Sequence, residues 1–417
     1  RKLVSIDNQQ MRFNPILTIL PISEHLLFVG TDGAGAWLID QKELGVLQAF
    51  RQQEGIEFTL SGDGVYDIFR DREGRVWIST YSDGVNILDF GRQGFQILRH
   101  EKNMINSLGR DHVSSILEDT HGRIWFATNN GVSIFNPLNN QWQHILDNTN
   151  VLAIYEDSRG TIWVGTYAKG VYRLNLQGRV LKHFMRHGNA NEIGSNFIYT
   201  LLEDSNGDIW MGGKKGPISK YQVKEDVFSY IPLSQANYFV MRNRSEMVMA
   251  CESGVYVMDV ATGNYIQTKF SANLKSRYVC DIHFESDSII WLATYGDGLN
   301  RCNYYTGEVM RFTTKSGLNS DFVYAILPDD SNGLWFSSEN GIGKIELDTY
   351  AITHITIGDG ISDTRFRQLS RLKSRSGNLY FGSYNGVTYF HPDKITLHET
   401  KAKIVLTDFL LFNQKMK

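Results

Sequence analysis

The sequence has 417 residues, of which 42% are hydrophobic and 12% aromatic, and its formal net charge at pH 7 is −3. This composition is typical of a globular chain with ample material for a core. The Lys and Arg residues are scattered rather than gathered into a basic stripe, which argues against a nucleic-acid partner, and the apolar runs fall short of the roughly 18 residues that a membrane-crossing helix needs.

A short pattern returns along the chain and defines the predicted elements. Its clear copies, in chain order, are RDREGRVWISTYSDG (70–84), EDTHGRIWFATNNG (118–131), EDSRGTIWVGTYAKG (156–170), EDSNGDIWMGGKKG (203–216) and DDSNGLWFSSENG (329–341). Degraded copies occupy 23–40, 242–259, 285–303 and 375–390, which makes nine copies in all. A catalytic motif normally occurs once in a domain, whereas an architectural motif repeats with the element that it builds. The pattern is therefore predicted to be mainly architecture.

Each copy is predicted to form four antiparallel β-strands. Around Trp163 these are VLAIYED (151–157), TIWVGT (161–166), VYRLN (171–175) and VLKHFM (180–185), with a tight turn at Gly160. The Trp or its stand-in recurs at positions 28, 77, 125, 163, 210, 248, 291, 335 and 380, at intervals of 38 to 49 residues. Four strands at that period predict the blade of an all-β β-propeller, with the Trp wedged between neighbouring blades.

The acidic pairs of the repeat are predicted to be structural. Glu118/Asp119, Glu156/Asp157 and Glu203/Asp204 come at the same hairpin of different copies, where an Asp side chain caps the amides of the turn. No catalytic residue, metal ligand or cofactor is expected in this segment.

Cysteines and histidines carry no recognisable motif. Cys251, Cys280 and Cys302 lack CxxC or His-linked spacing and are predicted to be buried filler. Among the 11 histidines, His112 and His283 lie near predicted first strands and are candidates to face a central channel.

The consensus eD-x-x-G-x-(I/L/V)-W-(I/V/F)-x-T-x-x-G resembles the two-component regulator propeller repeat, which occurs in the periplasmic sensor region of hybrid two-component systems of Bacteroidetes-type bacteria. NLYFGSYNGVTYFHPDKI (378–395) resembles the last blade of that family. KIVLTDFLLFNQKMK (403–417) resembles the first strand of the immunoglobulin-like domain, named for three tyrosines, that follows it. The copy at 242–259 departs from the consensus, because Val248 and Cys251 stand where Trp and Thr are usual.

The resemblance also implies a domain organisation. The family usually carries seven-bladed propellers in tandem, so counting seven blades back from the last places a ring at 106–392. Residues 1–105 would then be two further blades that end a preceding propeller, and 393–417 the first strand of the following domain. The alternative is a single ring of eight or nine blades.

The resemblance implies that this segment is the extracytoplasmic sensor of a hybrid histidine kinase. It would lie in the periplasm, be tethered to the membrane through parts outside this chain, and bind an oligosaccharide as a homodimer whose rearrangement controls polysaccharide-utilisation genes. The segment itself would not be an enzyme. The alternatives are a propeller-fold polysaccharide lyase or glycosidase, which needs two carboxylates or a Tyr/His pair in one mouth, and a platform for protein partners.

The loops between the second and third strands of the blades are expected to share one face of the ring and to hold the ligand site. Aromatic, amide and charged side chains suit sugar rings and hydroxyls. The candidates in these loops are Asn129, Tyr167, Lys169, Lys214, Lys215, Tyr295, Asp297, Tyr384 and Asn385, and Arg365 and Arg367 come from the segment 357–368 between blades. Lys214 and Lys215 could meet the carboxylate or sulfate of an acidic glycan. The alternative for each of these residues is an ordinary solvated turn position.

Overall fold

The computed structural model describes residues 14–43, 45–52, 59–72, 74–88, 94–102 and 104–395, together with the short strands β36 (Leu410–Leu411) and β37 (Gln414–Lys415). The chain divides into two compact units, Arg1–Gln93 with Ile395–Lys417, and Gly94–Lys394. The predicted first strand of a following domain lies for the most part outside the described residues. Within them, no helix is both long enough and apolar enough to cross a membrane.

Residues 16–88 of the first unit form two sheets. One has the order β1 (Ile16–Pro21), β2 (Leu26–Thr31), β3 (Ala36–Asp40) and β4 (Gly45–Phe50), and the other has β5 (Val65–Arg70), β6 (Val76–Thr80) and β7 (Val85–Leu88). Phe28 and Leu38 of the first sheet pack against Val65 and Ile78 of the second. The first two repeats therefore stack as blades do. Their membership of a preceding propeller stays a prediction.

The second unit consists of seven four-stranded antiparallel sheets. In chain order the strands of the first three are β9 (Val113–Glu118), β10 (Ile124–Thr128), β11 (Gly131–Asn136), β12 (Gln141–Ile145), β13 (Val151–Glu156), β14 (Ile162–Thr166), β15 (Val171–Leu174), β16 (Val180–Phe184), β17 (Phe197–Glu203), β18 (Ile209–Lys214), β19 (Pro217–Gln222) and β20 (Val227–Ser234). Those of the last four are β21 (Ala236–Met241), β22 (Glu246–Cys251), β23 (Gly254–Asp259), β24 (Tyr265–Gln267), β25 (Val279–Phe284), β26 (Ile289–Thr294), β27 (Leu299–Asn303), β28 (Val309–Phe312), β29 (Val323–Pro328), β30 (Gly333–Ser338), β31 (Gly341–Glu346), β32 (Ile352–Ile355), β33 (Phe366–Lys373), β34 (Leu379–Ser383), β35 (Val387–Phe390) and β8 (Gln96–Leu98). Short 3-10 turns occur at η1 (Lys269–Asn273), η2 (Thr314–Ser316), η3 (Ile357–Asp359) and η4 (Pro392–Lys394).

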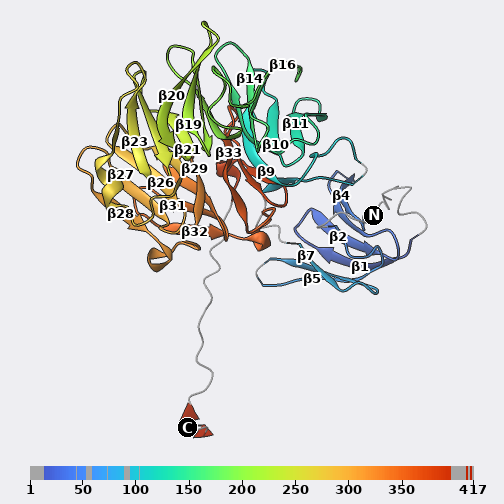
Figure 1. The fold of residues 1–417 in the computed structure, drawn as a ribbon. Helices are drawn as coiled ribbons and strands as arrows, with labels where there is room; N and C mark the ends of the chain where they lie inside the picture. Colours follow the sequence, from blue (N-terminus) through green and yellow to red (C-terminus); the bar gives the residue numbers. More distant parts are fainter. Residues whose placement is uncertain are drawn as a thin grey trace. The chain divides into compact units, whose positions relative to one another are not determined.

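These seven sheets close into a ring. The first strand of each sheet contacts the first strand of the next, and β33 of the last sheet contacts β9 of the first, as Figure 1 shows where the red end of the ring meets its cyan beginning. This closure rules out the single ring of eight or nine blades. The last sheet is built from both ends of the second unit: β8, from its beginning, pairs with β35, from its end, at Val387 and Leu98. The second unit therefore begins at Gly94, ahead of the predicted start at 106. The prediction counted repeats of the motif, and β8 lies before the first motif of the ring and contains no part of it.

The repeated Trp is a wedge between blades, as predicted. Trp125, Trp163, Trp210, Trp291 and Trp335 are at most 1% exposed. Trp163 on β14, for example, packs against Ile209, Met211 and Tyr221 of the next sheet. Val248 and Tyr380 stand in the place of the Trp in their repeats. Both are buried and pack against residues of the next sheet, as the Trp residues do. All three cysteines are buried, as predicted, and none of them forms a disulfide.

The Asp of each clear copy joins the hairpin to the wedge. Oδ1 of Asp157 accepts the backbone N–H groups of Arg159 at 3.0 Å and Thr161 at 2.9 Å, and Oδ2 accepts the indole N–H of Trp163 at 2.9 Å. Burial alone raises the pKa of Asp157, but these hydrogen bonds and the Arg159 guanidinium bring it below its usual value. The same indole bond recurs at Asp119, Asp204 and Asp329. The predicted capping role is confirmed, and the indole bond, which sequence reasoning missed, explains why Asp and Trp keep a spacing of six.

Candidate functional site

Every innermost strand of the ring carries a β-bulge near its start. On β13, Val151 pairs with Thr166 and Ala153 with Gly165, so that Leu152 has no partner residue on β14. Such an extra residue bends the strand and re-aims a side chain. The residues in this position are Ser114, Leu152, Tyr199, Asn237, Cys280, Tyr324 and the segment 367–370.

The bulges bring one residue or more from each of the seven innermost strands to a single cavity of about 340 Å³. Because all seven blades contribute, this cavity lies on the axis of the ring, at its mouth. Its size is in the range of sites for small ligands. The lining residues are Ser114, Leu152, Tyr199, Lys214, Asn237, Tyr278, Cys280, Tyr295, Tyr324, Phe366, Arg367, Gln368, Leu369 and Tyr384. Two of them are cations, and the lining contains no Asp or Glu.

The seventh blade supplies the largest share of this lining. On β33 the register passes from Phe366↔Ser383 directly to Arg371↔Phe381, which leaves a bulge of four residues where the other blades have one. Leu369 within it has a φ of 59°, a left-handed conformation that a branched side chain rarely adopts. Conformations of this kind cluster at ligand sites. The expanded bulge places Arg367, Gln368 and Leu369 together in the cavity.

Tyrosines form one wall of the cavity. Tyr295, which is 48% exposed, meets the ring of Phe322 edge-on at 4.7 Å and lies 5.6 Å from the ring of Tyr278. The Tyr278 hydroxyl is 3.4 Å from Oε1 of Gln368. Burial raises the pKa of Tyr278 to about 12, so its hydroxyl is neutral and can donate a hydrogen bond at physiological pH. This wall offers flat apolar faces with hydroxyl edges.

Arg367, Tyr384 and His112 form a stacked cluster at another side of the mouth. Nη1 of Arg367 donates to the Tyr384 hydroxyl at 2.8 Å, and the guanidinium carbon lies 4.9 Å from the centre of the same ring. The His112 imidazole stacks on Tyr384 with ring centres 4.9 Å apart. Burial, and then the charge of Arg367, lower the pKa of His112 to about 4. His112 is therefore neutral at pH 7, and the positive charge of this cluster belongs to Arg367 alone.

We expect His112 to titrate well below the 6.5 of an unperturbed imidazole. Between pH 6.5 and about 4 the unfolded chain binds the extra proton and the folded chain does not, so the contribution of neutral His112 to stability is complete above pH 6.5 and is lost as the pH falls through this window. An NMR titration of the imidazole signals should place the midpoint near 4, and Arg367→Gln should raise it. A midpoint near 6.5 in the folded protein contradicts the burial of this ring.

Farther along the same strands, an ion pair ties the inner strands together. The Arg371 guanidinium on β33 donates to both carboxylate oxygens of Asp281 on β25 and, at 2.9 Å, to the Tyr238 hydroxyl on β21. Asp281 also accepts the backbone N–H groups of Ile282 and Ile326, each at 2.8 Å. The Asp281 carboxylate is fully buried. It is therefore committed to the fold rather than to the cavity.

Of the residues predicted to bind a ligand, the structure brings four together. Lys214, Tyr295, Arg367 and Tyr384 all line the axial cavity. Arg365 lies next to them, 5.5 Å from the centre of the Tyr384 ring, but outside the lining. The other predicted residues on this face, Asn129, Tyr167, Lys169, Lys215, Asp297 and Asn385, are outside it as well.

Several of these outlying residues have structural partners. Nζ of Lys169 donates to the Asn148 carbonyl at 2.7 Å, and Lys215 lies 5.1 Å from the centre of the Phe197 ring. Asp297 is only 4% exposed and pairs with Arg311 at 3.4 Å. The ring of Tyr167 meets Phe197 edge-on, the backbone N–H of Asn385 donates to the Ser383 hydroxyl, and the Asn129 side chain is exposed.

Sequence reasoning missed most of the lining. The prediction did not include Ser114, Tyr199, Asn237 and Tyr324. They lie inside strands, and a regular alternation of side chains along a strand would point them between two sheets and away from the axis. The available signal was positional, since each is the second or third residue of its first strand.

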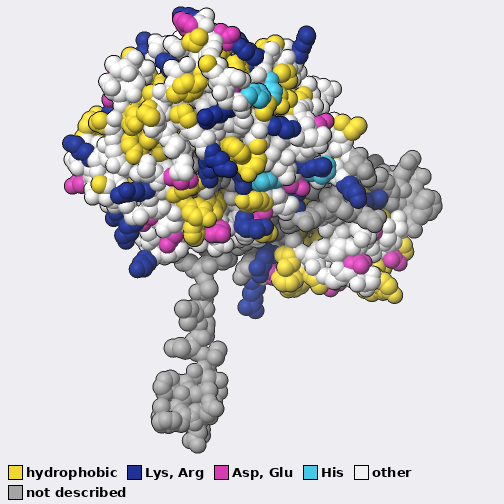
Figure 2. All heavy atoms as spheres, viewed as in Figure 1, with side chains coloured by type: hydrophobic (Ala, Val, Ile, Leu, Met, Phe, Trp, Pro, Cys, Tyr) yellow, Lys and Arg dark blue, Asp and Glu magenta, His cyan; other side chains and the backbone are white. Residues whose placement is uncertain are grey.

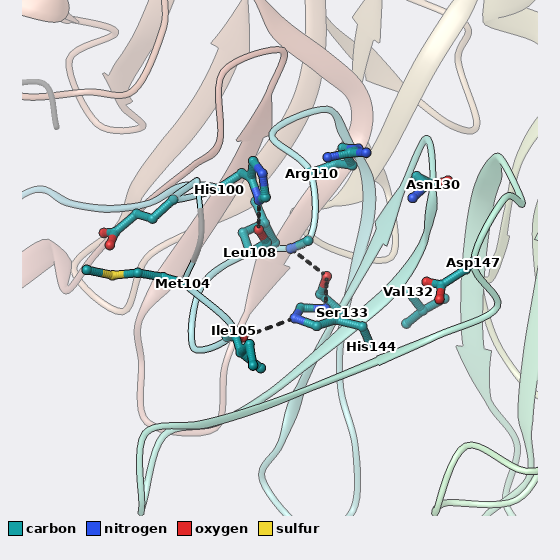
Figure 3. A pocket seen from close by; sticks show the side chains of 12 residues that line it. His100, Met104, Ile105, Leu108, Arg110, Asn130, Val132, Ser133, His144 and Asp147 are labelled. Carbon is teal, nitrogen blue, oxygen red and sulfur yellow. Dashed lines mark hydrogen bonds between the residues drawn. The ribbon is translucent and has the colours of Figure 1, made fainter. Parts of the chain in front are cut away.

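A second cavity of about 380 Å³ lies beside the outer strands of the first blade (Figure 3). In it the Ser133 hydroxyl lies 3.1 Å from Nδ1 of His144, and Nε2 of His144 lies 3.3 Å from the Ile105 carbonyl. Equivalent histidines on other fourth strands, His183 and His354, likewise bond to backbone carbonyls. Ser133 is 1% exposed. The Ser–His contact is thus part of the repeated architecture and is not a nucleophile with its base.

A closed ring of seven four-stranded antiparallel sheets around an axial cavity defines a β-propeller. On the face that Figure 2 shows, Lys and Arg side chains are scattered among acidic and hydrophobic ones and form no continuous stripe. The sequence pattern of the two-component regulator propeller family matches five segments, 59–82, 107–130, 145–168, 192–215 and 317–340. These five segments are two-component regulator propeller repeats, which confirms the resemblance noted in the sequence.

Known proteins resemble the chain at modest identity. It is 24% identical over 280 residues to "Histidine kinase P4" of Formosa agariphila, covering 66% of this chain but only 18% of that protein. The extracellular domain of the putative hybrid two-component system BT3049 from B. thetaiotaomicron is similar with a TM-score of 0.74 and 22% identity, over 91% of this chain and 51% of that one. The corresponding domain of BT4673 from the same organism has a TM-score of 0.61 and 19% identity, over 97% of this chain and 56% of that one. The chain thus spans about half the length, or less, of these relatives, and the likeness to the two solved structures shows the fold.

Proposed function

We propose that this chain is the extracytoplasmic sensor module of a hybrid two-component histidine kinase, and that it binds an oligosaccharide in the axial cavity. The observation that carries the proposal is the lining of that cavity. Five tyrosines supply flat faces for sugar rings, and Asn237, Gln368, Lys214 and Arg367 supply partners for hydroxyl groups. The likeness to the extracellular domains of the two B. thetaiotaomicron proteins supports a periplasmic location.

Signalling requires a difference between two states of the receptor. An oligosaccharide shifts an equilibrium only by the difference between its affinities for the two states. In our proposal those states are two arrangements of a homodimer, linked to the membrane and the kinase through other parts of the full-length protein. The kinase would in turn control genes for polysaccharide use.

Isothermal titration of the 417-residue chain with a panel of neutral and acidic oligosaccharides tests the binding step. Replacing Tyr295 by alanine should weaken the binding of a ligand about two- to tenfold, because the exposed ring loses its stacking contact. Tyr167→Ala is the matched control, since Tyr167 holds the same place in its repeat but lies outside the cavity. If every sugar fails to bind, or if Tyr295→Ala behaves like Tyr167→Ala, the axial site is refuted.

A polysaccharide lyase is the second candidate, because the mouth holds a Tyr/His pair beside an arginine. The imidazole of His112, however, is not part of the cavity lining. A glycosidase is disfavoured because the cavity lining has no pair of carboxylates. Analysis of the titrated mixtures for shortened or unsaturated products separates a sensor from either enzyme, and binding to a protein alone would favour an interaction platform.

A further inference from the structure

We propose that the axial cavity contains a subsite for an anionic group, centred on Arg367, so that its ligand is an oligosaccharide carrying a carboxylate or a sulfate. This inference rests on the proposed function, because it assigns a ligand class to the same cavity. Both groups present a compact anion on a sugar ring, and a guanidinium binds either one through two parallel hydrogen bonds.

The first observation is the charge of the cavity lining. It contains Lys214 and Arg367 and no carboxylate. Lys214 has a distant counterion outside the cavity lining, since its Nζ lies 3.9 Å from a carboxylate oxygen of Glu252. Arg367 has no counterion among the described residues. Its guanidinium contacts only the ring and the hydroxyl of Tyr384 there. A partly buried cation without a counterion is costly to desolvate, and an anion that enters the cavity removes that cost.

The second observation is the presence of unused hydrogen-bonding atoms beside Arg367. Nε of Arg367 is buried and has no hydrogen-bond partner. Ser114, which is 4% exposed and lines the same cavity from β9, has a buried hydroxyl that is also unpartnered. The strands β33 and β9 that carry these residues contact each other at the closure of the ring. A hydroxyl donor and a guanidinium on adjacent strands suit the several oxygens of a carboxylate or sulfate.

The third observation separates Arg367 from the other basic residues of this face. Lys215 and Arg365, both predicted from the sequence to add positive charge, lie outside the cavity. Arg367 enters it because the four-residue bulge of β33 carries it there. The subsite is therefore a property of the seventh blade and of its junction with the first.

The test compares three classes of oligosaccharide of equal length by isothermal titration: neutral, uronate-containing and sulfated. The unmodified chain should bind at least one acidic class more tightly than the neutral class, and raising the salt from low to physiological concentration or above should weaken only the acidic binding. Arg367→Gln should reduce affinity for the acidic ligand about ten- to hundredfold, and it should weaken any neutral binding much less, because a neutral sugar loses only a hydrogen bond to a hydroxyl group. Arg365→Gln is the matched control and should have little effect. Ser114→Ala should give a smaller loss, again only for the acidic ligand.

The outcomes distinguish the subsite from the proposed function. Equal, salt-independent binding of neutral and acidic ligands, or equal effects of Arg367→Gln and Arg365→Gln, overturns the anion subsite while the sugar site stands. Failure of every oligosaccharide to bind overturns the proposed function and the subsite with it. The salt dependence of the unmodified chain tests the subsite even if Arg367→Gln disturbs Tyr384. The uronate and sulfate arms show which anion the subsite accepts.

Discussion

Replacing Trp163 by alanine is expected to lower the free energy of unfolding of the ring by about 3–5 kcal/mol. The indole is fully buried and packs between the second and third blades, against Ile209 and Met211. Its removal leaves a cavity between two sheets that cannot close without moving a blade, because each sheet is held by neighbours on both sides. It also removes the indole N–H that Asp157 accepts at 2.9 Å.

Urea denaturation followed by tryptophan fluorescence and far-UV circular dichroism measures this loss. Trp142→Ala is the matched control, because Trp142 lies on the outermost strand of a blade, is only half-buried, and contacts Phe126 and Phe135. The control should cost markedly less. Equal losses at the two sites would refute the role of the repeated Trp as the wedge between blades.

Replacing Asp281 by alanine is expected to cost a similar 3–5 kcal/mol, for an electrostatic reason. The change leaves the Arg371 guanidinium without its counterion and leaves the amides of Ile282 and Ile326 without their acceptor. An unpaired charge and unsatisfied amides in a buried site each carry a desolvation cost.

Two further variants test this explanation in the same denaturation experiment. Adding Arg371→Met to Asp281→Ala should recover part of the lost stability, because the stranded charge is removed along with its partner. Asp330→Ala breaks the exposed pair with Lys373, at 2.6 Å, and should change stability by about 0.5 kcal/mol or less. If the double variant is less stable than Asp281→Ala alone, the loss does not come from an unpaired arginine.

Loop positions were predictable from the sequence, but membership of the site was not. Tyr167 and Tyr295 occupy the same place in their repeats, and only Tyr295 lines the cavity. Lys214 and Lys215 are neighbours in one loop, yet Lys214 enters the cavity and Lys215 packs over Phe197. These differences depend on where the folded ring places each loop and on its neighbours in the next blade, and the repeat itself encodes neither.

The sequence by itself determined the blade, because the spacing of Asp, Gly and Trp is set by bonds within one hairpin and by the wedge that each blade presents to the next. The tertiary structure alone decided how the ring closes and what lines its axis. Closure depends on β8 pairing with β35 across nearly 300 positions of the chain, and the axial cavity depends on bulges that alternation does not reveal. Contacts of long sequence separation leave no periodic trace, which is why Arg367, Ser114 and Tyr324 came together only in the folded ring.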